Sequence, residues 1–185
     1  MRSSSSGVTL IELVVVLALL GAALAAIGGM IRSAYRGMSL AERHLEVQQN
    51  VRVAVDKVTE ELRWGEAVLA DPQCGGLCAE RITVRISPHN PRSPGQAYVV
   101  SFRRDKVQRE LERKRGKGVN NLAGSIESLT FRYFDAAGAP AGSPQDVVRV
   151  EVTVVASSGS LTPPAARTVV TDVFLRNRPP IPPPP

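Results

Sequence analysis

The sequence contains little cysteine, histidine or aromatic residue, and each scarcity excludes a class of protein. Two cysteines and two histidines among 185 residues are too few for a disulfide-rich scaffold or a zinc site with four cysteine ligands. One Trp, three Tyr and four Phe mean that a core must be mostly aliphatic. The motifs of serine hydrolases, zinc proteases and phosphate-binding loops are also absent. We therefore expect neither an enzyme nor a protein that holds a metal or another cofactor.

The mean hydropathy is near zero and the formal net charge is +6, which on average describes a mildly basic soluble protein. The average is misleading because the apolar residues are concentrated in one place. From Leu13 to Ile31, 19 consecutive residues carry no charge, which just reaches the span of about 20 residues that a bilayer helix needs. No other stretch approaches this length without a charge, so the sequence predicts one membrane segment at most.

Helix breakers are missing from the first third of the chain, where no proline occurs between Met1 and Asp71. Val51, Val55, Val58 and Leu62 recur at spacings of four, three and four, which is the apolar stripe of an amphipathic helix. We predict one continuous helix over about 8–64, roughly 85 Å long at 1.5 Å per residue. Its first half is apolar on all sides, and its second half has one apolar face.

After the helix the pattern is typical of β-strands, so the fold class is predicted as α+β, with the long N-terminal helix packed on an antiparallel sheet. The predicted strands have β-branched or aromatic residues in partial alternation and cover 82–86, 97–103, 106–111, 126–134, 146–156 and 167–176. Turns are predicted at Asp105-Lys106 and at Asp135–Gly138, where Asp135 is a turn-former. The predicted organisation is a leader at 1–7, an apolar half-helix at 8–31, an amphipathic half-helix at 32–64, a connecting loop at 65–80, a β-rich domain at 81–178 and a proline-rich tail at 179–185.

The most informative segment is Gly7-Val8-Thr9-Leu10-Ile11-Glu12-Leu13, directly before the apolar run. A lone carboxylate at the middle of a membrane helix costs on the order of 2.5–3.5 kcal/mol, so Glu12 needs a partner. If the chain were cut after Gly7, the new amino group of Val8 would supply a cation one helical turn from Glu12. The same amine on a neighbouring copy would also satisfy Glu12. Such a pair in a dry helix bundle would fix the axial register between subunits.

This segment resembles the class III signal of type IV pilins and type II secretion pseudopilins. The resemblance implies that a prepilin peptidase cuts between Gly7 and Val8 and that the amino group of Val8 is then methylated. It also implies that Glu12, the fifth residue of the mature chain, guides filament assembly. Two departures are Val8, where phenylalanine is usual, and a short serine-rich leader with Arg2 as its only cation. Removal of the leader leaves a side-chain charge of +6 − 1 = +5.

The β-rich part is similar to the globular half of J-type pseudopilins and related minor pilins. The similarity lies in VVSFRRDKVQREL, SIESLTFRYFDAAG and VVRVEVTV. It implies a minor subunit at a filament tip or initiation complex, in a hetero-oligomer with other pilins or pseudopilins. The precursor would be a single-pass protein of the bacterial inner membrane with a periplasmic globular domain, and the mature chain would move to a filament in the periplasm or at the cell surface.

Three other interpretations stay open for the chain as a whole. An ordinary secretory signal peptide would use Ala23-Leu24-Ala25 as its cleavage site, and a signal anchor would keep the segment uncut. Both leave Glu12 unexplained. Within a filament, the globular domain would serve either assembly or binding, for example in DNA uptake or adhesion.

Cys74 and Cys78 enclose three residues, two of which are glycine. The pair is predicted to form a disulfide, which an oxidising compartment favours; a free thiol pair and half of a metal site are the alternatives. The metal site is the less favoured interpretation, because His44 and His89 are distant in sequence from the two cysteines. We expect structural or incidental roles for both histidines.

The basic excess is local. Residues 103–117 contain eight cations and three acids, a net charge of 8 − 3 = +5. This possible basic patch could contact nucleic-acid phosphates, acidic subunits or lipid headgroups, but the simpler reading is a solvated hairpin partly neutralised by Glu110 and Glu112. Nucleic acid is the less favoured partner, since no aromatic residue is interleaved to stack on bases. The eight cations are Arg103, Arg104, Lys106, Arg109, Arg113, Lys114, Arg115 and Lys117.

Overall fold

The computed structural model describes residues 9–158 and 166–176. It divides into two compact units, one up to Glu42 and one from Arg43 onward. The predicted leader, with Gly7 and Val8, and the proline-rich tail at 179–185 lie outside the described residues.

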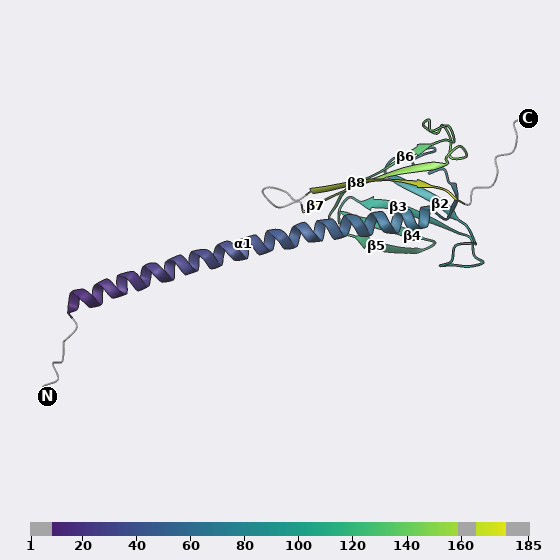
Figure 1. The fold of residues 1–185 in the computed structure, drawn as a ribbon. Helices are drawn as coiled ribbons and strands as arrows, with labels where there is room; N and C mark the ends of the chain where they lie inside the picture. The colour runs from purple at the N-terminus through teal and green to yellow at the C-terminus, as the bar shows by residue number, and fades with distance from the viewer. Residues whose placement is uncertain (1–8, 159–165, 177–185) are drawn as a thin grey trace, which may run out of the picture. The chain divides into compact units, whose positions relative to one another are not determined.

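One long helix, α1, begins at Leu10 and ends at Leu62 (Figure 1). Its 53 residues confirm the predicted continuous helix, with each end within two residues of the expected position. The helix is unbroken because proline is absent from it and its glycines are isolated or paired only at Gly28-Gly29. In its last five turns, Val51, Val58 and Leu62 are buried, as the stripe predicted, while Val55 is half-buried.

The first sheet is an antiparallel meander in the order β1-β2-β3-β4-β5, so each strand pairs with its neighbour in sequence. Its central strands bury alternate residues, among them Val84, Val100 and Phe102. The strands are β1 (Gly65–Val68), β2 (Arg81–Ile86), β3 (Tyr98–Asp105), β4 (Glu110–Arg115) and β5 (Gly118–Ala123).

The second sheet has the order β6-β7-β8 and is also antiparallel. It consists of β6 (Ile126–Phe134), β7 (Arg149–Ser157) and β8 (Ala166–Phe174). The bounds of β6 agree with the predicted strand, and those of β7 and β8 overlap the predicted ones with small shifts. Asp135 forms the predicted turn after β6, since its Oδ1 accepts hydrogen bonds from the backbone N–H groups of Ala137 and Ala139, both 2.9 Å.

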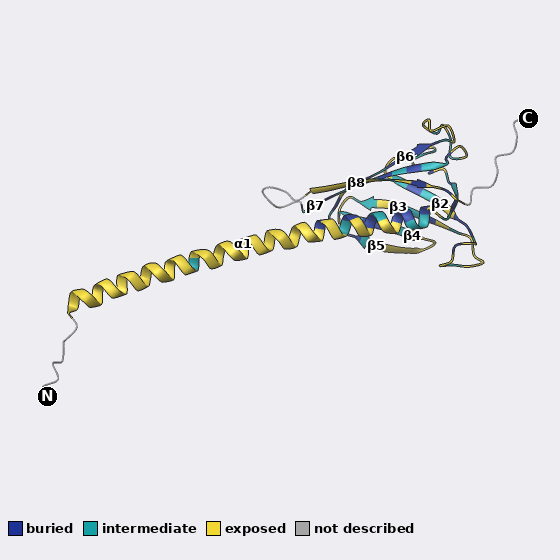
Figure 2. Ribbon diagram, in the orientation of Figure 1, coloured by how far each residue is buried: buried dark blue, intermediate teal, exposed yellow. Residues whose placement is uncertain are grey.

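The core lies where the buried stripe of α1 meets the inner faces of both sheets (Figure 2). β7 contributes Val150, Val152 and Val154, all fully buried, because its side chains alternate between the core and the outer face. The α+β class with a long N-terminal helix on antiparallel sheets is therefore confirmed.

Two sequence predictions of local structure were wrong, and one further strand was not predicted. The expected connecting loop at 65–80 begins with strand β1, which was missed because it has four residues and starts with glycine. The strand expected at 106–111 is mostly a turn: Asp105 accepts hydrogen bonds from the N–H groups of Val107 and Gln108, and Arg109 has a positive φ of 55°. The strand therefore starts later, at Glu110. β5 was missed because Gly118, Asn120 and Asn121 are poor strand formers, and pairing with β4 overrides their preference.

Candidate functional site

The start of α1 is built by Thr9 and Glu12. The hydroxyl of Thr9 accepts a hydrogen bond from the N–H of Glu12 at 3.3 Å, and its carbonyl accepts one from the N–H of Leu13 at 3.2 Å. Thr9 is thus the N-cap, and Glu12 is the acidic residue of the first turn, where a carboxylate is favoured by the helix dipole. Sequence analysis missed this role of Thr9, although the Thr-x-x-Glu spacing of a capping box signals it.

The residues that follow Glu12 form an apolar and exposed helical stretch. Exposed side chains include those of Leu13, Val16, Leu20, Leu24 and Ile31, and Figure 2 shows this part of α1 as exposed. By length and composition, α1 is the one helix among the described residues that could cross a membrane, and none of its most apolar window is buried. Apolar side chains in this number leave water only in a lipid or against other apolar helices.

Sequence comparison places this stretch in a known class. Residues 2–28 match the prokaryotic N-terminal methylation motif. The match includes Gly7, Val8 and Glu12, and it agrees with the pilin-like processing signal inferred from the sequence. It spans a small part of the chain and carries no support for a J-type subunit in particular. No curated protein matches the chain. The motif is that of processed structural subunits, and an apolar N-terminal helix agrees with membrane anchoring.

The structure describes only one of the three residues predicted to act in processing and assembly. Gly7, the predicted cleavage residue, and Val8, the predicted methylation site, lie outside the described residues. Glu12 is described and exposed on the first turn of α1, so its carboxylate is open to a partner from another chain. Cleavage, methylation and the assembly role of Glu12 stay predictions.

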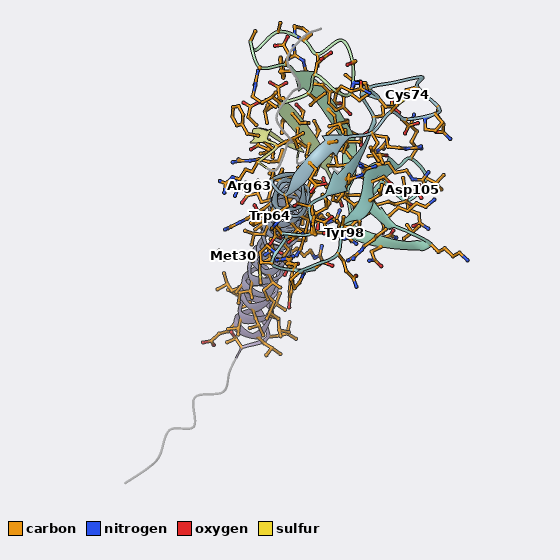
Figure 3. The ribbon with its side chains drawn as sticks, turned by 90° about the vertical axis from the view of Figure 1, so that its right-hand side faces the viewer. Met30, Arg63, Trp64, Cys74, Tyr98 and Asp105 are labelled. Atoms are coloured by element: carbon orange, nitrogen blue, oxygen red, sulfur yellow. A yellow bond between two sulfur atoms is a disulfide. The ribbon has the colours of Figure 1, made fainter. Side chains whose placement is uncertain are left out.

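Cys74 and Cys78 lie in the loop after β1 (Figure 3), and the structure joins their sulfur atoms. The buried Asp71 organises this loop: its Oδ1 accepts a hydrogen bond from the N–H of Gln73 at 2.8 Å, and its Oδ2 accepts one from Arg81 at 3.3 Å. The sequence marks Asp71-Pro72 as a turn, but it does not reveal the contact of Asp71 with Arg81, which lies ten residues later. The oxidised state in the exported chain stays a prediction, which equal masses with and without reduction after alkylation would contradict.

A tyrosine of β6 also anchors the loop through hydrogen bonds. The Tyr133 hydroxyl lies 2.7 Å from the carbonyl oxygen of Cys78 and 3.1 Å from that of Arg81. Burial, with the charge of Asp71 as a smaller cause, raises the pKa of Tyr133, so the phenol stays protonated and remains a hydrogen-bond donor. These contacts are structural, and they give the cysteine loop a fixed position on the β-rich unit.

The eight cations of the predicted basic patch do not form one free surface. Six of them contact groups of their own chain, and several contacts are ion pairs. Lys106 pairs with Glu80 at 2.8 Å, and the hydrogen bond between them is the main cause that lowers the pKa of Glu80. The other five cations are Arg103, which contacts Glu112; Arg104, which contacts the Ile126 carbonyl; Arg109, which contacts Glu127; Arg113, which contacts Glu61; and Arg115, which contacts Ser93 and the Tyr98 ring.

Lys114 and Lys117 are exposed, and within the described part of the chain the ammonium group of neither makes an ion pair or hydrogen bond, although the backbone of Lys114 pairs within the sheet. Of the two acids expected to neutralise the patch, Glu112 pairs with Arg103, whereas Glu110 accepts a hydrogen bond from Asn121. The other acidic partners, Glu61, Glu80 and Glu127, lie outside residues 103–117. Only the tertiary structure brings these three glutamates to the cations.

The two histidines do not belong to a metal-binding cluster within the residues that the structure describes. His89 is exposed, with its Nδ1 3.1 Å from the Ser87 hydroxyl, and His44 is exposed on α1. Among the described residues, no three His, Cys, Asp or Glu side chains gather closely enough to hold a metal ion.

Proposed function

We propose that this chain is a minor pilin or pseudopilin of J-like type, which a prepilin peptidase processes and which is then assembled into a type IV pilus-like or type II secretion filament. One observation supports this most: an acidic first turn opens a long, exposed apolar helix within a segment that matches the N-terminal methylation motif. This combination is unfavourable in a protein that stays in water, because the apolar surface needs lipid or other helices around it. Once it is surrounded in this way, the carboxylate needs a cation as its partner.

The proposed mechanism begins with the precursor in the bacterial inner membrane, with the stretch Leu13–Ile31 in lipid and the globular unit in the periplasm. The peptidase cuts between Gly7 and Val8 and methylates the new amino group. The helix then leaves lipid for a bundle of other pilin helices, where the Glu12 carboxylate pairs with the N-terminal amine of a neighbour. A register error would leave that charge unpaired in an apolar bundle, which is strongly unfavourable.

We place the subunit in a hetero-oligomer at the tip or initiation complex of the filament, where minor subunits act. The similarity of its β-rich part to J-type pseudopilins supports this position. The energy that extracts the helix from lipid comes from other proteins, because no phosphate-binding loop is present in the sequence.

The test is Glu12→Ala in the full chain, with Glu42→Ala as the control, since Glu42 is an exposed glutamate of the same helix beyond the apolar stretch. We expect Glu12→Ala to be cut after Gly7 like the native chain but to be lost from sheared filaments, while Glu42→Ala is incorporated normally. The mature N-terminus is read by mass spectrometry. Equal incorporation of both variants, or a chain that starts after Ala25, would refute the proposal.

A binding role in DNA uptake is the second candidate, and it depends on Lys114 and Lys117, the two cations of the patch without a contact in the described residues. Two lysines can neutralise about two phosphates, whereas a protein with tight, salt-dependent DNA binding makes roughly 6–10 phosphate contacts. The electrostatic attraction to DNA would therefore be weak. Replacement of both lysines by serine would reduce DNA binding and its salt dependence if this role were real. An unchanged salt dependence would exclude it.

A further inference from the structure

Among the described residues, strand β8 pairs along one edge only, and no strand pairs with its other edge. It is the last strand of its sheet, and all nine residues pair with β7 on one side. The pairing from Arg149–Phe174 to Ser157–Ala166 runs without a register shift, so no bulge bends the strand. An edge of this kind presents a regular row of backbone N–H and C=O groups to any extended chain that approaches it.

The other outer strands of the two sheets are protected in ways that β8 is not. β1 has four residues and a register shift beside Gly65. β5 contains Gly118 and two asparagines. The outer edge of β6 is covered by its own chain, since the N–H groups of Ile126 and Phe131 donate to the carbonyls of Arg109 and Ala79 at 2.7 and 2.8 Å. Short strands, irregular strands and edges covered by other segments of the chain are common ways in which proteins prevent a sheet edge from pairing with another molecule.

β8 instead has the composition of a strand that pairs on both sides. Residues 166–174 contain no proline, glycine or lysine, and four successive residues, Thr168–Thr171, are β-branched. On its outer face Val170 and Phe174 are 56% and 59% exposed, and Figure 2 shows exposed residues along the strand. An unprotected, β-branched edge of this length in a native protein indicates a strand-shaped partner.

A groove of about 320 Å³ runs between β8 and α1. Its apolar lining is formed by Val51 and Val55 from α1 and Val169 from β8. Among the charged residues that line it, Arg52 and Asp56 pair with each other at 3.7 Å, whereas Arg167 has no ion pair within the described residues. A strand added to β8 would place alternate side chains over this lining, with a free cation near the start of β8.

We propose that the edge of β8 accepts an extended segment of a neighbouring, non-identical pilin-like subunit as a fourth strand of the β6-β7-β8 sheet. The inference rests on the proposed function for the nature of the neighbour. The segment carries apolar residues at alternate positions facing the half-buried Val55 and Val169, and an acidic residue that meets Arg167. The backbone ladder supplies affinity and the alternate side chains supply specificity, as in other cases of strand addition.

Two other occupants fit less well. The C-terminal segment 179–185 of the same chain has six prolines, which lack the N–H groups that a ladder requires. A second copy would pair β8 with β8 about a two-fold axis, and such an isologous contact closes into a dimer. A filament needs a contact between two different surfaces, because only such a contact continues from one subunit to the next.

The test places a photo-cross-linking amino acid at Thr168, Val170 or Asp172 of the full chain, in cells that assemble the filament. The matched control is Thr153 in β7, which lies directly opposite Val170 but on a strand with neighbours on both sides. We expect the β8 positions to cross-link to one other pilin-like subunit, at residues two apart within a single segment, and the Thr153 position to give no such ladder. Arg167→Glu should lower the cross-link yield about tenfold, since like charges across an interface cost more than 1.4 kcal/mol.

Cross-links to β8 of a second copy, scattered cross-links without the spacing of two, or no cross-links in a chain that assembles normally would each overturn the inference. The proposed function fails differently, through an uncut N-terminus or an assembly that does not depend on Glu12. A ladder of cross-links in an uncut chain would therefore keep the strand partner and reject the filament role.

Discussion

At the scale of single residues, the pair of Glu61 and Arg113 ties the end of α1 to strand β4. Glu61 Oε1 accepts a hydrogen bond from Arg113 Nε at 2.7 Å, and the ion pair is completed by Arg113 Nη2, which lies 2.7 Å from the same oxygen. The two side chains are only 12% and 15% exposed, and within the described residues Glu61 Oε2 is buried without a partner. Glu61 also lies in the last turn of α1, where the helix dipole disfavours a carboxylate, so the glutamate depends on its arginine.

We therefore predict that Arg113→Met lowers the free energy of unfolding by about 3 kcal/mol, because it leaves a buried charge unpaired. The double variant Glu61→Leu with Arg113→Met should recover most of the loss. The control is Arg92→Met, which breaks the more exposed pair with Glu60 and should cost at most about 1 kcal/mol. Urea denaturation followed by circular dichroism measures all three, and equal losses for Arg113→Met and Arg92→Met would contradict the account.

At the scale of elements, Gly65 decides how α1 passes into β1. A side chain at this position has no room, since a Cβ atom would lie 2.8 Å from Leu175 Cδ2 and from Val84 Cγ1, and 2.9 Å from the Leu62 carbonyl oxygen. The absence of a side chain lets the first strand start three residues after the helix ends and still lie against β2. This close approach explains a glycine that the sequence alone suggested was part of a loop.

Gly65→Ala should destabilise the β-rich unit by about 1–3 kcal/mol, the usual cost of overpacking a core. Gly124→Ala is the matched control, because a Cβ atom there would meet nothing within 4 Å, and it should change the stability by less than about 0.5 kcal/mol. Thermal melts of the two variants against the native chain give the comparison. A harmless Gly65→Ala would mean that β1 and Leu175 move apart easily.

At the scale of the whole molecule, the chain has two parts made for different surroundings. Within the described part of the chain, every buried core residue lies at Val47 or later, in the unit that begins at Arg43. The unit up to Glu42 instead exposes apolar side chains from Leu10 to Leu40. The hydropathy near zero is thus the mean of two opposite segments.

A chain without residues 1–42 should consequently stay in the aqueous phase of a detergent partition and unfold in one cooperative transition, since it keeps the whole core. The full chain should move to the detergent phase, because its exposed apolar helix is removed from water there. Centrifugation and a urea titration followed by tryptophan fluorescence would show both. If the shortened chain aggregated or unfolded gradually, the core would depend on residues before Arg43.

The strongest local signals carried over to the structure because they need no distant partner. The absence of proline, the valine stripe of α1 and the alternation in β6 act through neighbouring residues, and all three predictions hold. β1, β5 and the start of β4 failed because pairing and close packing override weak local preference there. The processing site Gly7-Val8 is predicted from the sequence and stays a prediction, since it lies outside the described residues.

The sequence by itself determined the long helix, the apolar segment headed by Glu12 and the α+β class, since periodicity and composition are properties of the chain alone. The tertiary structure decided the rest. It brought Glu61, Glu80 and Glu127 to cations that looked free in sequence, seated the cysteine loop on Tyr133, and left β8 with an open edge. These depend on which distant segments meet, because ion pairs, burial and strand edges exist only once the chain has folded.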